Sequence, residues 1–112
     1  MFTFSDPYVR VEVSQVGRPT AKKQTSTHKK TANPIFEETF NFTISSKPDD
    51  LSSTSISLTI FDHERIRSDD VIGNVILGCM ATDVSQYGHW QEVIENPGET
   101  IVKWHYLIDT DD

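Results

Sequence analysis

Apolar and polar residues alternate along much of the chain, which is the pattern of β-strands with one buried face and one face in water. The alternation is clearest in residues 8–16, where valines occupy every second position, and it recurs in residues 36–44 and 56–61. Residues 71–78 and 101–108 are two further strand candidates of high apolar content. Turn-forming residues separate these runs, so the chain is predicted to be an antiparallel all-β domain.

Residues 20–31 also alternate, but lysine, serine, threonine and histidine fill both faces, so we expect an exposed edge strand that ends before Asn33-Pro34. Residues 45–53 form a polar connection. One helix is expected at residues 85–96, with Asp83 or Ser85 as its N-terminal cap. Its apolar face would hold Tyr87, Trp90, Val93 and Ile94.

Composition narrows the class of protein. The 112 residues suffice for one domain with a core of its own. A single cysteine, Cys79, excludes a disulfide framework, and its place at the end of an apolar strand predicts a buried, unreactive thiol. No apolar run is long enough to cross a bilayer, and the first residues do not resemble a secretory signal.

Charge is distributed unevenly. The net charge is −7, yet six of the ten basic residues lie in residues 1–30 beside only two of the seventeen acidic residues. An asymmetry of this kind points to two surfaces of opposite sign. Aromatic residues are not interleaved with the lysines, so we expect no nucleic-acid partner. The four histidines have no metal-ligand spacing, and no glycine-rich phosphate loop or nucleophile with a base is present, so we expect no enzyme.

Several short motifs follow one another along nearly the whole chain. They are Ser5-Asp6-Pro7-Tyr8-Val9, the lysine-rich residues 22–30, Asn33-Pro34, Glu38-Thr39-Phe40-Asn41-Phe42, Asp62-x-Glu64, Asp70-x-Ile72-Gly73, His89-Trp90 and Trp104-His105-Tyr106-Leu107. Together and in this order they resemble the C2 domain. The ending that follows the predicted helix resembles the second C2 domain of synaptotagmins and their tandem-C2 relatives.

The resemblance implies a Greek-key β-sandwich of eight strands, with one short helix before the last strand. Here only six strands are predicted, and in the family two more precede the segment at Ser5. We therefore expect residues 1–112 to form a single C2 domain that lacks those two strands. Either the domain is truncated at its N-terminus, or another chain completes the sheet in a strand-exchanged homodimer.

An acidic loop is the candidate metal site. Four carboxylates lie between Asp62 and Asp70, and calcium prefers clustered oxygens of this kind, although a loop of this composition is also a common solvated turn. The resemblance implies that Asp6, Asp62 and Asp70 are calcium ligands. Glu64 stands where the family has aspartate, and the first acid of the family's first loop would precede Met1. We therefore expect calcium to bind weakly.

Two further surfaces are implied by the resemblance. Ile66 matches a position that inserts into membranes, and Phe2 and Phe4 lie where the first loop has its tip, although the phenylalanines are equally suited to packing on the sandwich. The family's basic strand binds phosphoinositides, SNARE proteins and clathrin adaptors. The corresponding lysines here are Lys22, Lys23, Lys29 and Lys30, which would equally keep an edge strand soluble.

Two functions follow from these features. The first is a calcium-regulated module that binds anionic phospholipid, phosphoinositide and proteins during exocytosis, located in the cytoplasm on the surface of a vesicle or the plasma membrane. The second is a protein-interaction domain that works without calcium, has a degenerate metal site, and uses the lysine strand and the Trp104-His105 end. Binding to liposomes with calcium and with a chelator distinguishes the two.

Overall fold

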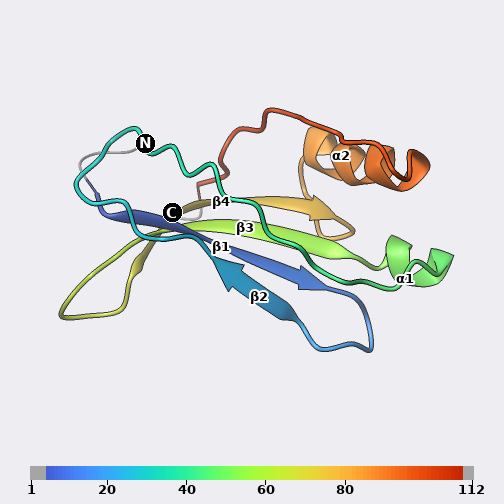
Figure 1. Ribbon diagram of the computed structural model, residues 1–112, viewed down its shortest axis with the longest axis horizontal. Helices are drawn as coiled ribbons and strands as arrows, with labels where there is room; N and C mark the ends of the chain where they lie inside the picture. The colour runs from blue at the N-terminus through green and yellow to red at the C-terminus, as the bar shows by residue number, and fades with distance from the viewer. Residues whose placement is uncertain (1–4, 110–112) are drawn as a thin grey trace.

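The computed structural model describes residues 5–109 and contains one antiparallel sheet of four strands in the order β2-β1-β3-β4 (Figure 1). The strands are β1 (Pro7–Ser14), β2 (Ala21–Gln24), β3 (Ser55–Asp62) and β4 (Asp70–Gly78). Two helices, α1 (Pro48–Ser52) and α2 (Val84–Glu95), complete the regular structure. The prediction of an antiparallel all-β fold is confirmed.

Strand β1 is the centre of the fold because it pairs along its length with β3 and over half its length with β2. Its alternation places Val9, Val11 and Val13 in the core, while Arg10 and Glu12 lie on the outer face. Tyr8 is also buried, and its ring stacks on that of Phe61 with centroids 5.2 Å apart. The alternating valines therefore define the buried face, as predicted.

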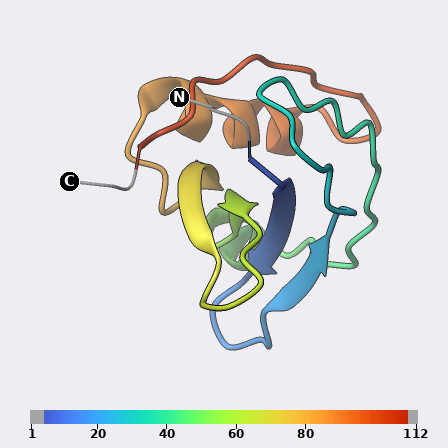
Figure 2. The ribbon, with the colours of Figure 1, turned by 90° about the vertical axis from the view of Figure 1, so that its left-hand side faces the viewer.

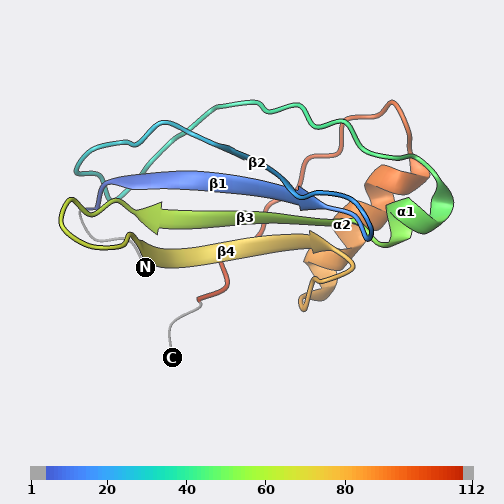
Figure 3. The same cartoon turned by 90° about the horizontal axis from the view of Figure 1, so that it is seen from below.

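The second layer is made of two extended segments, residues 33–46 and 97–108, which lie with α2 on one side of the sheet (Figure 2 and Figure 3). The predicted strands at 36–44 and 101–108 belong to this layer, but neither forms a ladder. Among residues 5–109, the pairing of these segments is limited to one bridge between Asn74 and Ile108. The strand prediction was wrong here for a physical reason. The alternation of apolar and polar residues shows which side of an extended segment is buried, but a β-strand also needs backbone hydrogen bonds to a neighbouring strand.

The predicted strand at 20–31 is regular only over Ala21–Gln24. Beyond it, the Thr25 hydroxyl accepts the hydrogen bond of the Val9 amide at 2.9 Å, in place of a backbone carbonyl. The chain nevertheless stays beside β1, because the amide of His28 donates to Pro7 and Thr31 pairs with Ser5. The edge therefore extends irregularly as far as the start of β1.

The helix prediction is confirmed within one residue, and Asp83 is its cap. The Asp83 carboxylate accepts hydrogen bonds from the Ser85 hydroxyl and from the amides of Ser85 and Gln86, and these bonds lower the pKa of Asp83. Trp90 is buried as expected, but Tyr87 is exposed and Gln86 takes the inward position. The short helix α1, which begins at Pro48, was not predicted from the polar connection.

The predicted burial of Cys79 was wrong, because the residue is exposed immediately after β4. Gly78 explains the turn: its φ is +95°, and a Cβ at this position would lie 2.2 Å from the Thr54 carbonyl oxygen. The amide of Cys79 donates to that same carbonyl, so the chain turns away from the core as β4 ends.

Candidate functional site: an acidic end and a basic edge of one sheet

Three of the predicted metal ligands meet at one end of the sheet. The register pairs Pro7 with Asp62 on β3, and Asp62 with Asp70 on β4, so the carboxylates that flank these strands are neighbours. The Asp6 amide donates to Asp62 Oδ1 at 3.0 Å, and the His63 amide donates to the Asp6 carbonyl. The sequence therefore identified residues that do come together in space.

The loop between β3 and β4 is organised by Asp69, which was not among the predicted ligands. Its Oδ1 accepts from the Glu64 amide at 2.8 Å, and its Oδ2 accepts from the Tyr8 hydroxyl at 2.5 Å. These bonds lower the pKa of Asp69, the Glu64 amide being the larger cause, and burial together with Asp69 raises the pKa of Tyr8. Asp69 thus ties the loop to the first strand.

The remaining acids of this end are bound by cationic or amide donors of the chain itself. Arg67 lies between Glu64, at 3.7 Å from Nη2 to Oε2, and Asp70, at 3.1 Å from Nη2 to Oδ2. The amide of Lys30 donates to Asp6 Oδ1 at 2.7 Å. The four predicted ligands therefore each have a protein partner.

These carboxylates are not gathered around one point. Across residues 5–109, no three histidine, cysteine, aspartate or glutamate side chains are placed to share one metal ion. Calcium takes six to eight oxygens, and here a guanidinium lies between Glu64 and Asp70. Calcium binding at Asp6, Asp62, Glu64 and Asp70 stays a prediction from the family resemblance.

Ile66 lies in the loop between β3 and β4, and its side chain is 93% exposed between Arg65 and Arg67. An apolar side chain must be exposed in this way if it is to enter a membrane. Membrane insertion of Ile66 stays a prediction. Phe2 and Phe4 lie outside the described residues.

The basic edge is formed by β2, all of whose residues are exposed. A shallow cleft of about 540 Å³ is lined by Arg10, Lys22, Lys23 and Gln24. The Arg10 guanidinium lies 4.7 Å from the centre of the Phe61 ring, and the Lys23 ammonium lies 5.0 Å from that of Phe42. The sequence analysis did not include Arg10 among the basic surface residues, although the alternation of β1 already placed it on the solvent-exposed face of the sheet.

The four predicted lysines do not form a single cluster. Lys22 is opposite Glu12 in the β1–β2 register, whereas Lys30 lies beside Asp6 at the acidic end. Six residues of chain along β1 separate Asp6 from Glu12, so Lys30 and Lys22 lie roughly 20 Å apart. Lys22 and Lys23 therefore belong to the basic edge with Arg10, and Lys29 and Lys30 belong to the acidic end.

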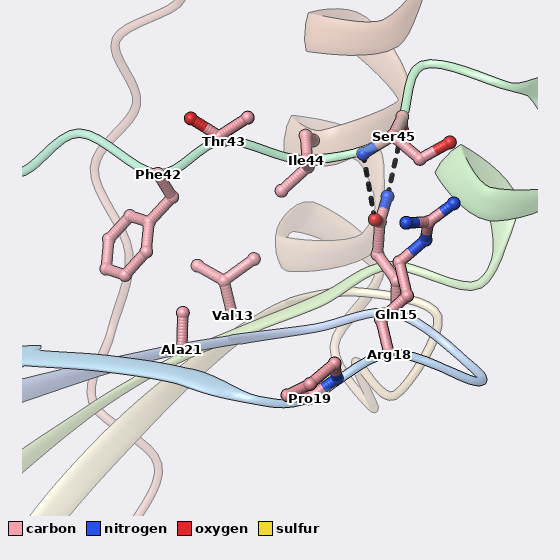
Figure 4. A pocket seen from close by; sticks show the side chains of 9 residues that line it. All are labelled: Val13, Gln15, Arg18, Pro19, Ala21, Phe42, Thr43, Ile44 and Ser45. Atoms are coloured by element: carbon pink, nitrogen blue, oxygen red, sulfur yellow. Dashed lines mark hydrogen bonds between the residues drawn. The ribbon is translucent and has the colours of Figure 1, made fainter.

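A second feature of this edge is a cavity of about 350 Å³ between the β1–β2 hairpin and residues 42–45 (Figure 4). Gln15 closes one end of it, with its amide group hydrogen-bonded to both the amide and the carbonyl of Ser45 at 3.0 Å. Arg18 forms an ion pair with Asp50 at 3.2 Å. Gln15 continues the series of every second residue that places Val9, Val11 and Val13 in the core, so the sequence already indicated that its side chain points inward.

Comparison with known proteins identifies the family to which this chain belongs. The C2 domain family matches residues 1–93. This chain belongs to the C2 domain family. It is 35% identical over 108 residues to Synaptotagmin 1 of Drosophila melanogaster and 39% identical over 102 residues to Synaptotagmin-11 of Rattus norvegicus. These matches cover 96% and 91% of this chain but only 22% and 23% of the relatives, so the chain spans less than a quarter of their length.

Solved C2 domains show the same fold. C2 domain A of plant Extended Synaptotagmin 1 superposes with a TM-score of 0.55 at 24% identity, over 66% of this chain and 52% of that one. C2 domain A of RIM from Drosophila gives a TM-score of 0.53 at 24% identity, over 70% and 64%. In the described part of this C2 chain, no helix has the length and apolar character needed to cross a bilayer.

Proposed function

We propose that this C2 domain is a non-enzymatic module that docks on anionic membrane surfaces, phosphoinositide headgroups included, through its basic edge and without a calcium ion. The observation that carries the proposal is the cleft of Arg10, Lys22, Lys23 and Gln24, which gathers three cationic side chains on one exposed edge. Kinship with synaptotagmins supports a role in membrane trafficking on the cytoplasmic side of a vesicle or the plasma membrane.

The chemistry of the edge suits phosphate groups. Arginine binds phosphate oxygens with two parallel hydrogen bonds, and lysine supplies compact point charges beside it. The Phe61 ring beneath Arg10 restricts the guanidinium, so less side-chain entropy is lost when a headgroup binds. Each lysine near an anionic surface contributes about 1 kcal/mol at physiological ionic strength.

The acidic end supports independence from calcium. An ion bound by Glu64 and Asp70 would have to displace Arg67, which is paired with both. Arg65 is next to Ile66 and would face anionic lipid at the tip of this loop. The calcium-switch mechanism remains a prediction from the family resemblance, and the experiment below includes it as an outcome.

The test is co-sedimentation with liposomes that contain phosphatidylserine and a phosphoinositide, in calcium and in chelator. The double substitution Lys22→Gln and Lys23→Gln should weaken binding by about 30-fold, which corresponds to two lysines at about 1 kcal/mol each. The matched control is Lys29→Gln with Lys30→Gln, which changes the net charge equally at the other end of the sheet. Equal losses in both variants would refute the basic edge as the docking surface.

Calcium and salt provide the remaining outcomes. Binding should be the same in calcium and in chelator, and it should fall steeply with salt, because the screening length shortens from about 10 Å at 0.1 M to about 3 Å at 1 M. Stronger binding in calcium would overturn calcium independence. If Asp62→Asn with Asp70→Asn then abolished the increase, the calcium-regulated function would replace the one proposed.

A protein partner is the second candidate occupant of the same edge, and SNARE or clathrin-adaptor proteins stay predictions from the family resemblance. The cavity beside Gln15 adjoins this edge and would accept an apolar side chain. Binding to a soluble partner that is unaffected by liposomes, together with no binding to liposomes alone, would favour this candidate.

A further inference from the structure

The connection between β1 and β2 displays its side chains to solvent. Residues 16–20 are all exposed, and the connection projects from the sheet on the side away from α2 (Figure 1). Its turn is shaped by Gly17, whose φ is +79°, and by the Arg18 amide, which donates to the Gln15 carbonyl at 3.1 Å. Thr20 ends the connection and is followed directly by β2.

Thr20 has basic residues on both sides along the chain. Arg18 lies two residues before it, and Lys22 and Lys23 lie two and three residues after it. Among the serines and threonines of the sequence, Thr20 alone has a basic residue at each of the two positions that are two residues away. Protein kinases select their substrates by charge patterns of this kind. The pattern therefore marks Thr20 as a phosphate acceptor.

The hydroxyl of Thr20 is available for reaction, because within residues 5–109 the side chain is exposed and makes no hydrogen bond. Two hydroxyls farther along the same edge are engaged. Thr25 is buried and bonded to the backbone of β1, and the Ser26 hydroxyl donates to a carboxylate at 3.2 Å. Thr27 is exposed, but no basic residue lies two positions before it.

The register places Thr20 beside the proposed docking surface. Ala21 is opposite the buried Val13, so Thr20, one residue earlier, faces the outer side of the sheet together with Lys22. Alternate residues of a strand are about 7 Å apart, which is less than the screening length of about 8 Å at physiological ionic strength. A charge added at Thr20 therefore acts on Lys22 and on the cleft that Lys22 lines.

We propose that Thr20 accepts a phosphoryl group from a protein kinase that selects basic surroundings, and that this phosphorylation switches off docking at the basic edge. The Thr20 hydroxyl oxygen bonds to the γ-phosphorus of ATP, the bond between that phosphorus and ADP breaks, and the hydroxyl proton passes to the catalytic aspartate of the kinase. The switch rests on the proposed function, whereas the modification itself does not.

A phosphate at Thr20 opposes docking in two ways. It carries a charge of about −1.5 to −2 at pH 7, which offsets the charges of Arg10, Lys22 and Lys23 and repels an anionic surface. Its oxygens also accept hydrogen bonds from the Lys22 ammonium, which is then occupied when a lipid headgroup approaches. Both effects act on the cations that carry the proposed docking.

The first experiment tests the modification on the whole, folded chain. The chain is incubated with the catalytic domain of protein kinase C and MgATP, and mass spectrometry locates the phosphate. Thr20 should be the principal site, Thr20→Ala should abolish most of the incorporation, and the control Thr27→Ala should leave it unchanged. Both variants should fold, because both side chains are exposed. A chain that acquires no phosphate at Thr20, or acquires it only after unfolding by heat, would overturn the proposal.

The second experiment tests the switch on liposomes of phosphatidylserine and a phosphoinositide. The phosphorylated chain should bind about 30-fold more weakly than the unmodified chain, because the charge of the edge changes by about two, as it does in Lys22→Gln with Lys23→Gln. Treatment with a phosphatase should restore the binding.

The lysine double variant separates the two ways in which this result can fail. Unchanged binding of the phosphorylated chain overturns the switch if the lysine double variant binds weakly. If that variant binds as well as the wild type, the proposed docking surface is refuted and the switch with it, whereas phosphorylation of Thr20 is still decided by the first experiment.

Discussion

A single buried side chain, Gln86, connects three parts of the fold. It is 1% exposed on α2, its Oε1 accepts from the Ile76 amide of β4 at 3.1 Å, and its Nε2 donates to the Tyr106 carbonyl at 3.2 Å. Substitution of Gln86 by methionine preserves the length of the side chain and removes both hydrogen bonds. The loss should therefore report on the polar connection rather than on packing.

The expected loss of stability follows from the two hydrogen bonds that the substitution removes. An intramolecular hydrogen bond contributes about 0.5–1.5 kcal/mol to stability. We therefore expect the free energy of unfolding to fall by about 2 kcal/mol.

Urea unfolding followed by circular dichroism measures the effect. With a slope of about 2 kcal/mol per molar urea, the midpoint should fall by about 1 M. Gln91→Met is the matched control, because Gln91 is on the same helix, is only partly exposed and makes no side-chain hydrogen bond within the described residues. If the two variants lose the same stability, the reasoning about Gln86 is refuted.

Three further predictions concern other positions. Asp83→Ala removes the cap of α2 and should cost about 1 kcal/mol in urea unfolding, whereas an unchanged midpoint would contradict the cap. Gly78→Ala should lower the melting temperature more strongly than Gly88→Ala, because a Cβ at Gly78 would lie 2.2 Å from the Thr54 carbonyl oxygen, whereas a Cβ at Gly88 would have no atom within 4 Å. Burial and the neighbouring His89 lower the pKa of His105, so the unfolded chain binds the proton more readily. The melting temperature should therefore fall as the pH drops below about 6.5, and His105→Gln should flatten this fall.

Much of the sheet could be predicted from local pattern alone. In β1 the alternation determines which residues are buried, because a strand in the middle of a sheet has neighbours on both sides and one covered face. The cap at Asp83 was equally readable, since an aspartate before a helical run satisfies amides that have no partner within the helix. These features depend on residues close together in the sequence.

The features that could not be predicted depend on residues far apart. The segment at 36–44 has the right alternation, but its hydrogen bonds require a strand beside it, which no local pattern reveals. The phase of α2 was wrong by one residue because Gln86 finds two backbone partners that lie 10 and 20 residues away. The pairing of Arg67 was missed for a different reason: Glu64 and Asp70 are each only three residues away, but the contact depends on how the loop turns.

The net charge of −7 would by itself predict repulsion from an anionic surface. The sheet order gives a different answer, because β2 is one edge and the acidic loop joins β3 and β4 toward the other edge. Between β2 and the midpoint of β3 and β4 lie about 12 Å of sheet, and Lys22 is about 16 Å along the strand from the acidic end. Both distances exceed the screening length of about 8 Å at physiological ionic strength, so the acids do not cancel the field of the basic edge. For the docking proposed here, the position of the charges on the sheet therefore matters more than their sum.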